Sequence, residues 1–558
     1  MKRASMFGSL VARTFSGLAL AAAVSVAGSG ATPKFYDDDP VRVERDAQDA
    51  SGVRPWDISL VVDLSYNLFG KPGDPAPNVR ARNVNTIEEV PDSSWFTNRL
   101  GSRPMTPDEI AKGPDSTTGP APGRWTVTSS KSDGVTPGFT IRDSTGQLWF
   151  LKFDPPGYRG MATGTEVVVT KLLWALGYYV PENYVTSLRR EQLVVGERAR
   201  FDPPGGKQRA MRLSDIDTLL KRADREPDGS YRIVASKALE GTILGGFRFY
   251  DTRPDDPNDV VPHEHRRDLR GYSVFAAWLN HVDAKAINSM DTLVKEGGRA
   301  FVRHNLLDFG STLGSASLSP REHWEGFEYM VEPGQTRKQM ATFGFYFPQW
   351  HTVDFYEAPS VGRLPLDNTR FDPDRWKPRV PNPAFVRARA DDKFWAAQKL
   401  VAFTDDMLRA AVRTGKFGDP KSEDFLVRAL AERRDAIGRA YLTAINPIAD
   451  PALDSAGVLT FRNAAVDAGF AKAPEGYHAS WSSFDNATGE NRRLGETSGA
   501  GPRLQAPAGL PGASGVFIKG ELSAVGGPNP SWQKPVHAYF HRLNAGWRLV
   551  GFERLPEG

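Results

Sequence analysis

The spacing of apolar residues predicts different structures along the chain. From residue 124 to 153, apolar and polar positions alternate and predict three strands, RWTVTSS, GFTIRD and QLWFLKF, the last two forming a hairpin. Residues 163–176 (TGTEVVVTKLLWAL) are almost continuously apolar and predict a buried helix that Gly177 ends. Further strands are expected at NYVTSL and SYRIVAS. The first structured region therefore combines strands with one buried helix.

After about residue 260 the pattern becomes helical. Helices are expected at 262–281, DDKFWAAQKLVAF, TDDMLRAAVRT and 420–444. From about residue 455 the chain is rich in Gly, Ser and Ala, and it ends in a hairpin, PVHAYFHRL–NAG–WRLVGFERL. Residues 32–118 are rich in Pro, Asp, Gly and Asn and predict an irregular arm. These patterns together indicate the α+β class.

Composition excludes several classes of protein. The 70 basic and 67 acidic residues give a net charge of only +3, so the concentrated basic excess of a nucleic-acid-binding protein is absent. Apolar residues make up 40% of the 558 residues, enough for a substantial core. The chain has no cysteine, which rules out disulfides, thiolate metal sites, cysteine nucleophiles and cysteine-linked lipid anchors.

The N-terminus has the pattern of an export signal. Lys2 and Arg3 precede a short apolar run, LALAAAVSVA, which is too short to span a bilayer. Small residues allow cleavage after Ala27 or Ala31, so we expect residues 1–31 to be a signal peptide and the protein to be periplasmic or secreted. A mitochondrial-type presequence is the alternative, because no acid occurs before Asp37. No other segment is long and apolar enough to cross a membrane.

Residues 281–310 hold the groups that phosphoryl transfer requires. The stretch HVDAKAIN gives H-x-D-x-K-x-x-N, and Asp308 begins an Asp-Phe-Gly sequence after a hairpin-like segment. Asp283 is a candidate catalytic base, Lys285 a cation for the moving phosphoryl group, and Asn288 and Asp308 are oxygen ligands for Mg²⁺. The hairpin would bring Asn288 and Asp308 together. The alternative is a polar loop beside a core helix with an unrelated Asp-Phe-Gly turn.

Two charged residues upstream fit the same chemistry. Lys152 lies in the apolar strand QLWFLKF, and Glu166 is the only acid of the apolar helix that follows. A partly buried lysine needs a partner, and Glu166 lies fourteen positions later, a workable distance from strand to helix. Taken alone, the lysine could extend its charged end to solvent, and the glutamate could be favoured by the dipole at the start of the helix. Taken together, the two residues predict an ion pair.

This order of residues resembles the protein-kinase-like fold over about residues 120–450. It is more similar to divergent kinases, such as the HipA-type and CotH-type groups, than to a eukaryotic-type protein kinase. It is also similar to a group of uncharacterised exported bacterial proteins that share HEHRRDLRG, WLNHVDAK and LLDFGSTLG. The resemblance implies that Lys152, held by Glu166, binds the phosphates of ATP. The chain departs from the family in its phosphate loop, which has only Gly134 and Gly138, and no A-P-E motif follows Asp-Phe-Gly within the kinase-like region of about residues 120–450.

The resemblance divides the chain into five parts. We expect a signal peptide (1–31), an irregular N-terminal arm (32–118), a kinase-like N-lobe (119–240), a kinase-like C-lobe (241–454) and a β-rich C-terminal domain (455–558). The expected activity is Mg²⁺·ATP-dependent phosphotransfer to a protein, lipid or small molecule. The alternatives are an inactive exported binding or scaffold protein, and an AMP transferase on the same fold. His263, Glu264 and His265 are expected to be polar residues at a helix start, and the neighbouring Arg267 to be solvated or paired with an acid.

Overall fold

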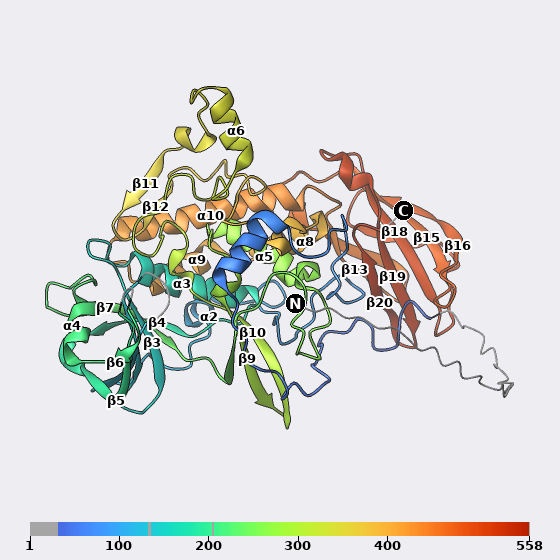
Figure 1. Cartoon of the computed structure of the whole chain (residues 1–558). Coiled ribbons are helices and arrows are strands. Elements are labelled where there is room, and N and C mark those ends of the chain that lie inside the picture. The colour runs from blue at the N-terminus through green and yellow to red at the C-terminus, as the bar shows by residue number, and fades with distance from the viewer. Residues whose placement is uncertain (1–31, 132–135, 204–205, 557–558) are drawn as a thin grey trace, which may run out of the picture.

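A computed structural model describes residues 32–131, 136–203 and 206–556, and it shows a mixed α+β protein (Figure 1). One lobe is a seven-stranded sheet in the order β4-β7-β3-β2-β1-β5-β6, in which only the β1–β5 pair is parallel. Its strands are β1 (Trp125–Ser130), β2 (Gly138–Arg142), β3 (Leu148–Phe153), β4 (Asn183–Leu188), β5 (Leu193–Phe201), β6 (Arg209–Ala210) and β7 (Tyr231–Lys237). The strands expected from the alternating pattern are therefore present.

The buried helix α3 (Met161–Leu176) packs against this sheet, and α4 (Leu213–Leu220) lies at its far end. Asp154, directly after β3, accepts hydrogen bonds from the backbone nitrogens of Gly160, Ala162 and Thr163 at 2.8–3.0 Å. This carboxylate satisfies the free N–H groups of the first helical turn, so the helix begins two residues before the expected Thr163. The cap also fixes the helix relative to the end of the strand that carries Lys152.

The second lobe is mainly helical. Its longest helix, α10 (Pro420–Leu442), is capped by Asp419. The other helices are α5 (Arg267–Trp278), α6 (Pro333–Ala341), α7 (Pro383–Val386), α8 (Ala390–Leu400) and α9 (Asp405–Thr414). Three small strands, β8 (Thr242–Gly245), β9 (Ser289–Glu296) and β10 (Arg299–Leu306), form one sheet, and β11 (Phe355–Ala358) pairs with β12 (Gly362–Pro365).

The C-terminal region is a β structure attached to the helical lobe. Two sheets, in the orders β13-β14-β17 and β16-β15-β18-β19-β20, form it, and β19–β20 is the expected final hairpin. The strands are β13 (Ile448–Leu453), β14 (Val458–Asn463), β15 (Gly476–Phe484), β16 (Asn491–Gly499), β17 (Arg503–Gln505), β18 (Phe517–Val525), β19 (Val536–Leu543) and β20 (Gly546–Glu553), with α11 (Ala464–Asp467) after β14. Trp481 and Trp532 are fully buried in the same core as the helical lobe.

Two separate hydrophobic cores define the two lobes. The sheet lobe has its own cluster, which includes Trp125, Phe139 and Trp149. The larger cluster joins α3, the helical lobe and the C-terminal sheets. A two-lobed α+β body of this kind, with a lysine on the third strand and a glutamate on the next helix, has the kinase-like architecture.

The N-terminal arm is more ordered than its composition predicts. It contains α1 (Leu60–Ser65), a π-helical turn η1 (Tyr66–Gly70) and α2 (Pro107–Lys112), with irregular segments between them. Trp95 and Phe96 from this arm are buried in the larger core. Two buried aromatic side chains explain how a Pro- and Gly-rich segment keeps a fixed path over the body.

The expected helix at 262–281 is shorter than predicted. His263–His265 form a separate 3₁₀ turn (η3), and α5 begins only at Arg267. The His, Glu and His side chains are buried rather than exposed at a helix start; His265 Nε2 contacts Asp74 Oδ2 of the arm at 3.0 Å.

The guanidinium of Arg267 is buried rather than solvated. It contacts Asp391 at 2.6 Å and Asp392 at 2.9 Å on α8, and it donates to the backbone oxygen of Glu88 in the arm at 2.7 Å. Burial lowers the pKa of Arg267, but the charges of Asp391, Asp392 and Glu88 outweigh burial and raise it. Of the two readings made from the sequence, pairing is correct, but the partners lie in α8 and the arm. This ionic cluster fixes the arm to the helical lobe.

Candidate functional site

The sheet lobe contributes a buried ion pair. Lys152 on β3 places Nζ 3.0 Å from Oε2 of Glu166 on α3, the pairing expected from the sequence. The Lys152 side chain is 18% exposed and that of Glu166 only 2%. The face of β3 that carries Lys152 is less buried than its apolar sequence suggests, since Phe150 on the same face is exposed. The lysine therefore lies at the edge of the sheet core.

Glu166 also binds the loop that contains Asp308. Its carboxylate accepts hydrogen bonds from the backbone nitrogens of Phe309 at 3.1 Å and Gly310 at 2.9 Å. Asp308 itself has φ +63°, in the left-handed region, and its Oδ1 lies 2.8 Å from Lys152 Nζ. A non-glycine residue in this conformation is unfavourable and is held by the contacts around it.

The helical lobe contributes a second cluster. Lys285 Nζ lies 2.7 Å from Asp283 Oδ1, and Asn288 Nδ2 donates to Asp283 Oδ2 at 3.0 Å and to its backbone oxygen at 2.7 Å. The β9–β10 hairpin begins directly after Asn288, and Leu307 N donates to the Asn288 backbone oxygen at 3.1 Å. Asn288 and Asp308 therefore lie at the base of one hairpin, as the sequence predicts.

Neighbouring positive charges lower the pKa values of the carboxyl groups in both clusters. Burial raises the pKa of Asp308, but Lys152 and Lys131 outweigh burial and lower it to about 2. Burial acts in the same way on Asp283, and Lys285 with Arg379 lowers its pKa below the ordinary value. Both groups are therefore carboxylates at neutral pH, as a proton acceptor and a metal ligand must be.

His281 completes the catalytic-loop sequence as a structural residue. Burial lowers the pKa of its imidazole to about 4, so the ring is neutral at physiological pH. It lies between the rings of Tyr272 and Phe309, with centroid distances of 6.1 and 6.0 Å. The ring therefore packs the loop that carries Asp283 against the loop that carries Asp308.

Three residues near the site were not found from the sequence. Lys131, at the end of β1, lies close enough to lower the pKa of Asp308, and its Nζ donates to Thr136 Oγ1 at 2.9 Å. Arg379 lies 4.0 Å from Asp283 Oδ1, and its backbone nitrogen donates to the Val282 oxygen at 2.8 Å. Each is distant in sequence from the aspartate whose pKa it lowers, so no local pattern signals it.

The third is Asp63 of the arm, which is 4% exposed. Burial raises the pKa of Asp63, while Arg248, Tyr250 and Lys285 act to lower it. Asn67 Nδ2 donates to Asp63 Oδ2 at 3.1 Å. A lone acid in the apolar run LVVDLSYNLF, four positions before a lone amide, was the available signal.

The two expected phosphate-loop glycines have different outcomes. Gly134 lies outside the described residues. Gly138 lies on β2 and pairs in register with Lys152 on β3. A Cβ at Gly138 would lie 2.4 Å from the Leu151 backbone oxygen, so close approach of β3 requires glycine here.

The donor set fits a divalent cation bound together with a nucleotide. The Asn288 amide nitrogen is used by Asp283, which leaves Oδ1 as the atom available to a metal. The Asp308 side chain is 38% exposed and carries a negative charge. Within the described residues no group of three or more His, Cys, Asp or Glu side chains is arranged to hold a metal ion. Two oxygen ligands plus substrate phosphates is the usual set for Mg²⁺ in kinase sites.

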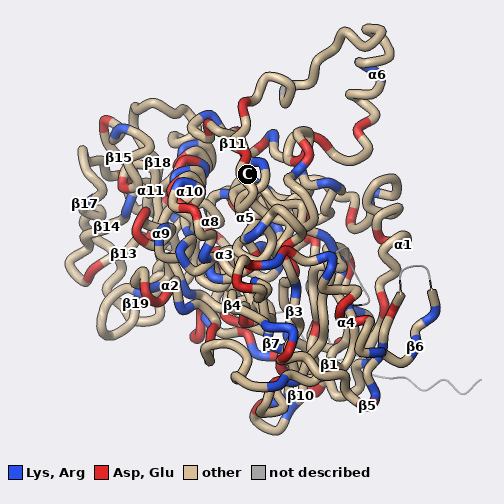
Figure 2. The backbone as a smooth tube through the Cα atoms, turned by 90° about the vertical axis from the view of Figure 1, so that its left-hand side faces the viewer, with Lys and Arg blue, Asp and Glu red and all other residues tan. Residues whose placement is uncertain are grey.

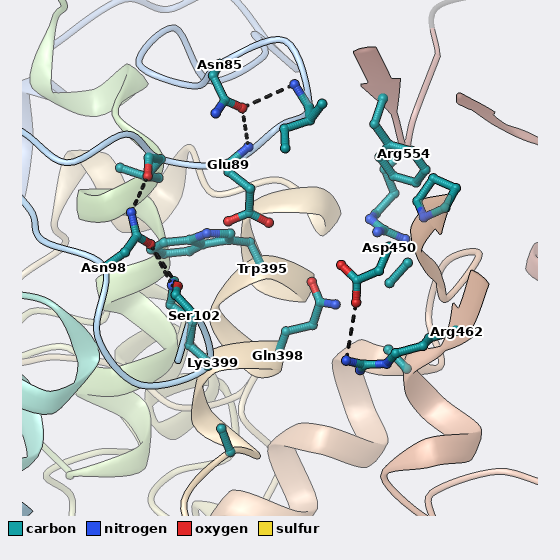
Figure 3. Close-up of a pocket in the computed structure, with 18 of the residues that line it drawn as sticks. Asn85, Glu89, Asn98, Ser102, Trp395, Gln398, Lys399, Asp450, Arg462 and Arg554 are labelled. Carbon is teal, nitrogen blue, oxygen red and sulfur yellow. Dashed lines mark hydrogen bonds and ion pairs between the residues drawn. The ribbon is translucent and has the colours of Figure 1, made fainter. Parts of the chain in front are cut away.

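A pocket of about 710 Å³ lies away from these clusters, between the arm, α8 and the C-terminal strands (Figure 3). Much of its polar lining is internally satisfied: Arg462 contacts Asp450 at 3.2 Å, and Lys399 Nζ donates to Asn98 at 3.0 Å. None of the expected site residues lines it. It is a crevice between packed units and is separate from the candidate active site.

Comparison with known proteins gives structural similarities only. No protein-family model matches the chain, and no curated protein sequence matches it. The Helicobacter pylori proinflammatory kinase CtkA matches with TM-score 0.27 and 11% identity, over 55% of this chain and 91% of that one. The Golgi casein kinase matches with TM-score 0.29 and 12% identity, over 72% and 94%. Its structure with Mn/ADP bound matches with TM-score 0.28 and 11% identity, over 59% and 74%. The assignment of the site rests on this chain's own side chains.

Proposed function

We propose that this chain is a divergent kinase-like phosphotransferase that uses Mg²⁺·ATP. The observation that carries the proposal is Lys152 in contact with both Glu166 and Asp308, beside a loop in which Asp283 is held by Lys285 and Asn288. A buried lysine and its partner carboxylates are costly to maintain, and phosphoryl transfer is a reaction that requires all of these groups.

The residues have separate roles in the proposed reaction. Asp283 accepts the proton of the acceptor hydroxyl while that oxygen bonds to the γ-phosphorus and the bond to the β,γ-bridging oxygen breaks, releasing ADP. Lys285 offsets charge on the transferred group, and Lys152 binds the phosphates that remain on the nucleotide. Asn288 and Asp308 would hold Mg²⁺, which supplies further neutralisation of phosphate charge.

The test uses the full chain with Mg²⁺·ATP. Nucleotide binding is measured by thermal shift, and products are identified by mass, with autophosphorylation followed in parallel. We expect Asp283→Asn to bind nucleotide like the wild type and to lose about 10²–10⁴-fold in transfer rate. We expect Asp308→Asn to lose the Mg²⁺-dependent part of binding. Asp424→Asn, on the exposed face of α10, is the matched control.

Each alternative predicts a distinct result. Binding of nucleotide without any product would favour an inactive scaffold with the same fold. An acceptor heavier by AMP would favour adenylyl transfer. Absence of nucleotide binding, or equal rates for wild type and Asp283→Asn, would refute the proposal.

Export also remains a proposal. Residues 1–31 lie outside the described part of the chain, and in the described part no helix is long and apolar enough to span a membrane. We infer export from the basic start and the short apolar run. The stretches HEHRRDLRG, WLNHVDAK and LLDFGSTLG support, separately, the proposed likeness to a group of exported bacterial proteins. The mass of the mature chain in the periplasm or medium tests it: cleavage after Ala27 or Ala31 is expected, and an unprocessed cytoplasmic chain would refute it.

A further inference from the structure

In the helical segment formed by α1 and η1, polar side chains face the body of the protein and apolar side chains face solvent. Asp63 and Asn67 are buried toward the body, whereas Val62, Tyr66 and Phe69 are 51%, 56% and 72% exposed. These three follow the i, i+4, i+7 spacing of one helical face. A surface helix of a soluble domain normally turns its apolar side chains to the core and its polar side chains to solvent. We therefore expect this exposed apolar face to contact another apolar surface.

The segment that contains α6 has a second exposed apolar group. It projects from the helical lobe, and no residue of α6 is buried (Figure 1). Met340, within α6, is 74% exposed, and after the helix Phe343, Phe345 and Phe347 are 92%, 82% and 67% exposed. Four large exposed apolar side chains therefore lie within eight residues of a segment that projects from the body.

Both segments are attached beside the catalytic loop. Helix α1 packs against the 3₁₀ turn η4 (Ala286–Asn288), which ends at Asn288. At the base of the α6 segment, Met330 N donates to the Arg379 oxygen at 2.7 Å, and Arg379 lies 4.0 Å from Asp283. In Figure 2 α1 and α6 project from the same side of the molecule. A surface that met both apolar groups would therefore lie next to Asp283.

The charge of these segments indicates what covers them. Residues 333–353 contain Arg337 and Lys338, both exposed, and no acid. In residues 58–73 the only acid is the buried Asp63, and Lys71 is exposed. Acids lie only at the bases of the two segments, at Asp57, Asp74, Glu332 and Asp354, so the exposed charges within each segment are basic. Apolar side chains with exposed lysine and arginine beside them match the interface of a bilayer with anionic headgroups.

We propose that α1–η1 and the segment that contains α6 seat the protein on an anionic lipid bilayer, with the apolar side chains inserted at the headgroup boundary. Two separate projecting segments suit a deformable lipid surface better than a rigid protein face. The proposal concerns this surface alone and does not depend on phosphotransfer. Membrane contact would explain why the α1–η1 segment buries Asp63 and exposes Phe69.

The test is co-sedimentation of the full chain with vesicles of phosphatidylcholine, alone or mixed with phosphatidylglycerol. We expect binding to the mixed vesicles, weakened by salt because Lys and Arg contribute. Val62→Ser/Phe69→Ser and Phe343→Ser/Phe345→Ser should each lower the partition coefficient about tenfold or more, since each removes two inserted apolar side chains. Phe343→Leu/Phe345→Leu keeps apolar area and should bind.

Matched controls are Leu213→Ser and Val260→Ser, which are 60% and 72% exposed outside these segments and should bind like the wild type. Asp308→Ala should also bind normally, which separates this proposal from the proposed activity. Absence of vesicle binding, or equal binding by the serine variants, would overturn the proposal. Light scattering that shows a dimer dispersed by Phe343→Ser/Phe345→Ser, without vesicle binding, would assign the surface to a second copy instead.

Discussion

Glu166 accepts a hydrogen bond of 2.9 Å from the backbone nitrogen of Gly310, which lies 144 positions further along the chain. The same carboxylate pairs with Lys152 at 3.0 Å and accepts from Phe309 N at 3.1 Å. One side chain therefore positions both Lys152 of the sheet lobe, for which we propose phosphate binding, and the loop that carries Asp308. The Glu166 carboxylate therefore links the two lobes at the site, and it has no direct contact with substrate in the proposed reaction.

Glu166→Gln tests this positioning role. The amide has only one oxygen acceptor, so it cannot satisfy Lys152, Phe309 N and Gly310 N together. We expect at least a hundredfold loss of transfer rate with the fold retained, measured by product formation and thermal unfolding. Glu182→Gln is the control, because Glu182 pairs with Lys237 at 2.8 Å in the same lobe, and it should retain activity. Normal turnover by Glu166→Gln would contradict the role.

Gly138→Ala should weaken nucleotide binding through the strand that carries Lys152. A Cβ would meet the Leu151 oxygen at 2.4 Å, so β2 and β3 must separate, and such overpacking costs about 1–3 kcal/mol. Gly512→Ala is the matched control, because no atom lies within 4 Å of a Cβ there. Thermal unfolding with and without Mg²⁺·ATP measures both effects, and a variant as stable as the wild type would contradict the close approach.

The sequence predicted the residues of the candidate site better than it predicted the residues that contact and position them. Lys152, Glu166, Asn288 and Asp308 lie in short motifs whose spacing reflects one strand, one helix and one hairpin, and the structure brings them together. Arg379 contacts the same site across nearly a hundred positions with no local pattern. Pairings of that range are set by tertiary packing, which a single sequence does not encode locally.

The arm shows the same limit. Its composition predicted irregular structure, and the long stretches between its short helices are irregular. What composition did not reveal is that Glu88 and Asn83 reach the buried Arg267 segment of α5 at hydrogen-bond distance. The sequence allowed Arg267 to be either solvated or paired with an acid, and in the structure pairing with acids offsets the cost of its burial.

Arg267→Met should therefore destabilise the whole body. It removes the cation that the buried Asp391 and Asp392 carboxylates share, while Arg389 still contacts Asp391 and Arg270 still contacts Asp392, both at 3.2 Å. Breaking a buried pair typically costs about 3–5 kcal/mol, and these remaining contacts place the expected loss at the lower end, about 3 kcal/mol. Arg409→Met, which breaks the exposed Arg409–Asp424 contact of 2.9 Å, should cost less than about 1 kcal/mol. Urea unfolding monitored by tryptophan fluorescence measures the difference, and equal effects of the two substitutions would show that the buried cluster contributes nothing particular.

Glu553 should make stability depend on acid pH. Burial raises the pKa of Glu553, but hydrogen bonds from His537 and Lys34, with the charge of Lys34, outweigh burial and lower it from 4.5 to about 2. The unfolded chain therefore binds more protons between about pH 4.5 and 2, so the stabilisation is complete above pH 4.5 and disappears as pH falls through 2.

Its size is at most about 3 kcal/mol, because the Glu553 side chain is 18% exposed and the Lys34 side chain 38% exposed, so solvent screens part of the contact. Glu553→Gln should flatten the plot of unfolding free energy against pH in this window, although Asp259 and Asp308, whose pKa values also fall to about 2, retain part of the slope. Glu490→Gln, on an exposed turn, should leave the plot unchanged. Equal slopes for wild type and Glu553→Gln would show that the Lys34–Glu553 contact between the two ends of the described chain contributes no stability.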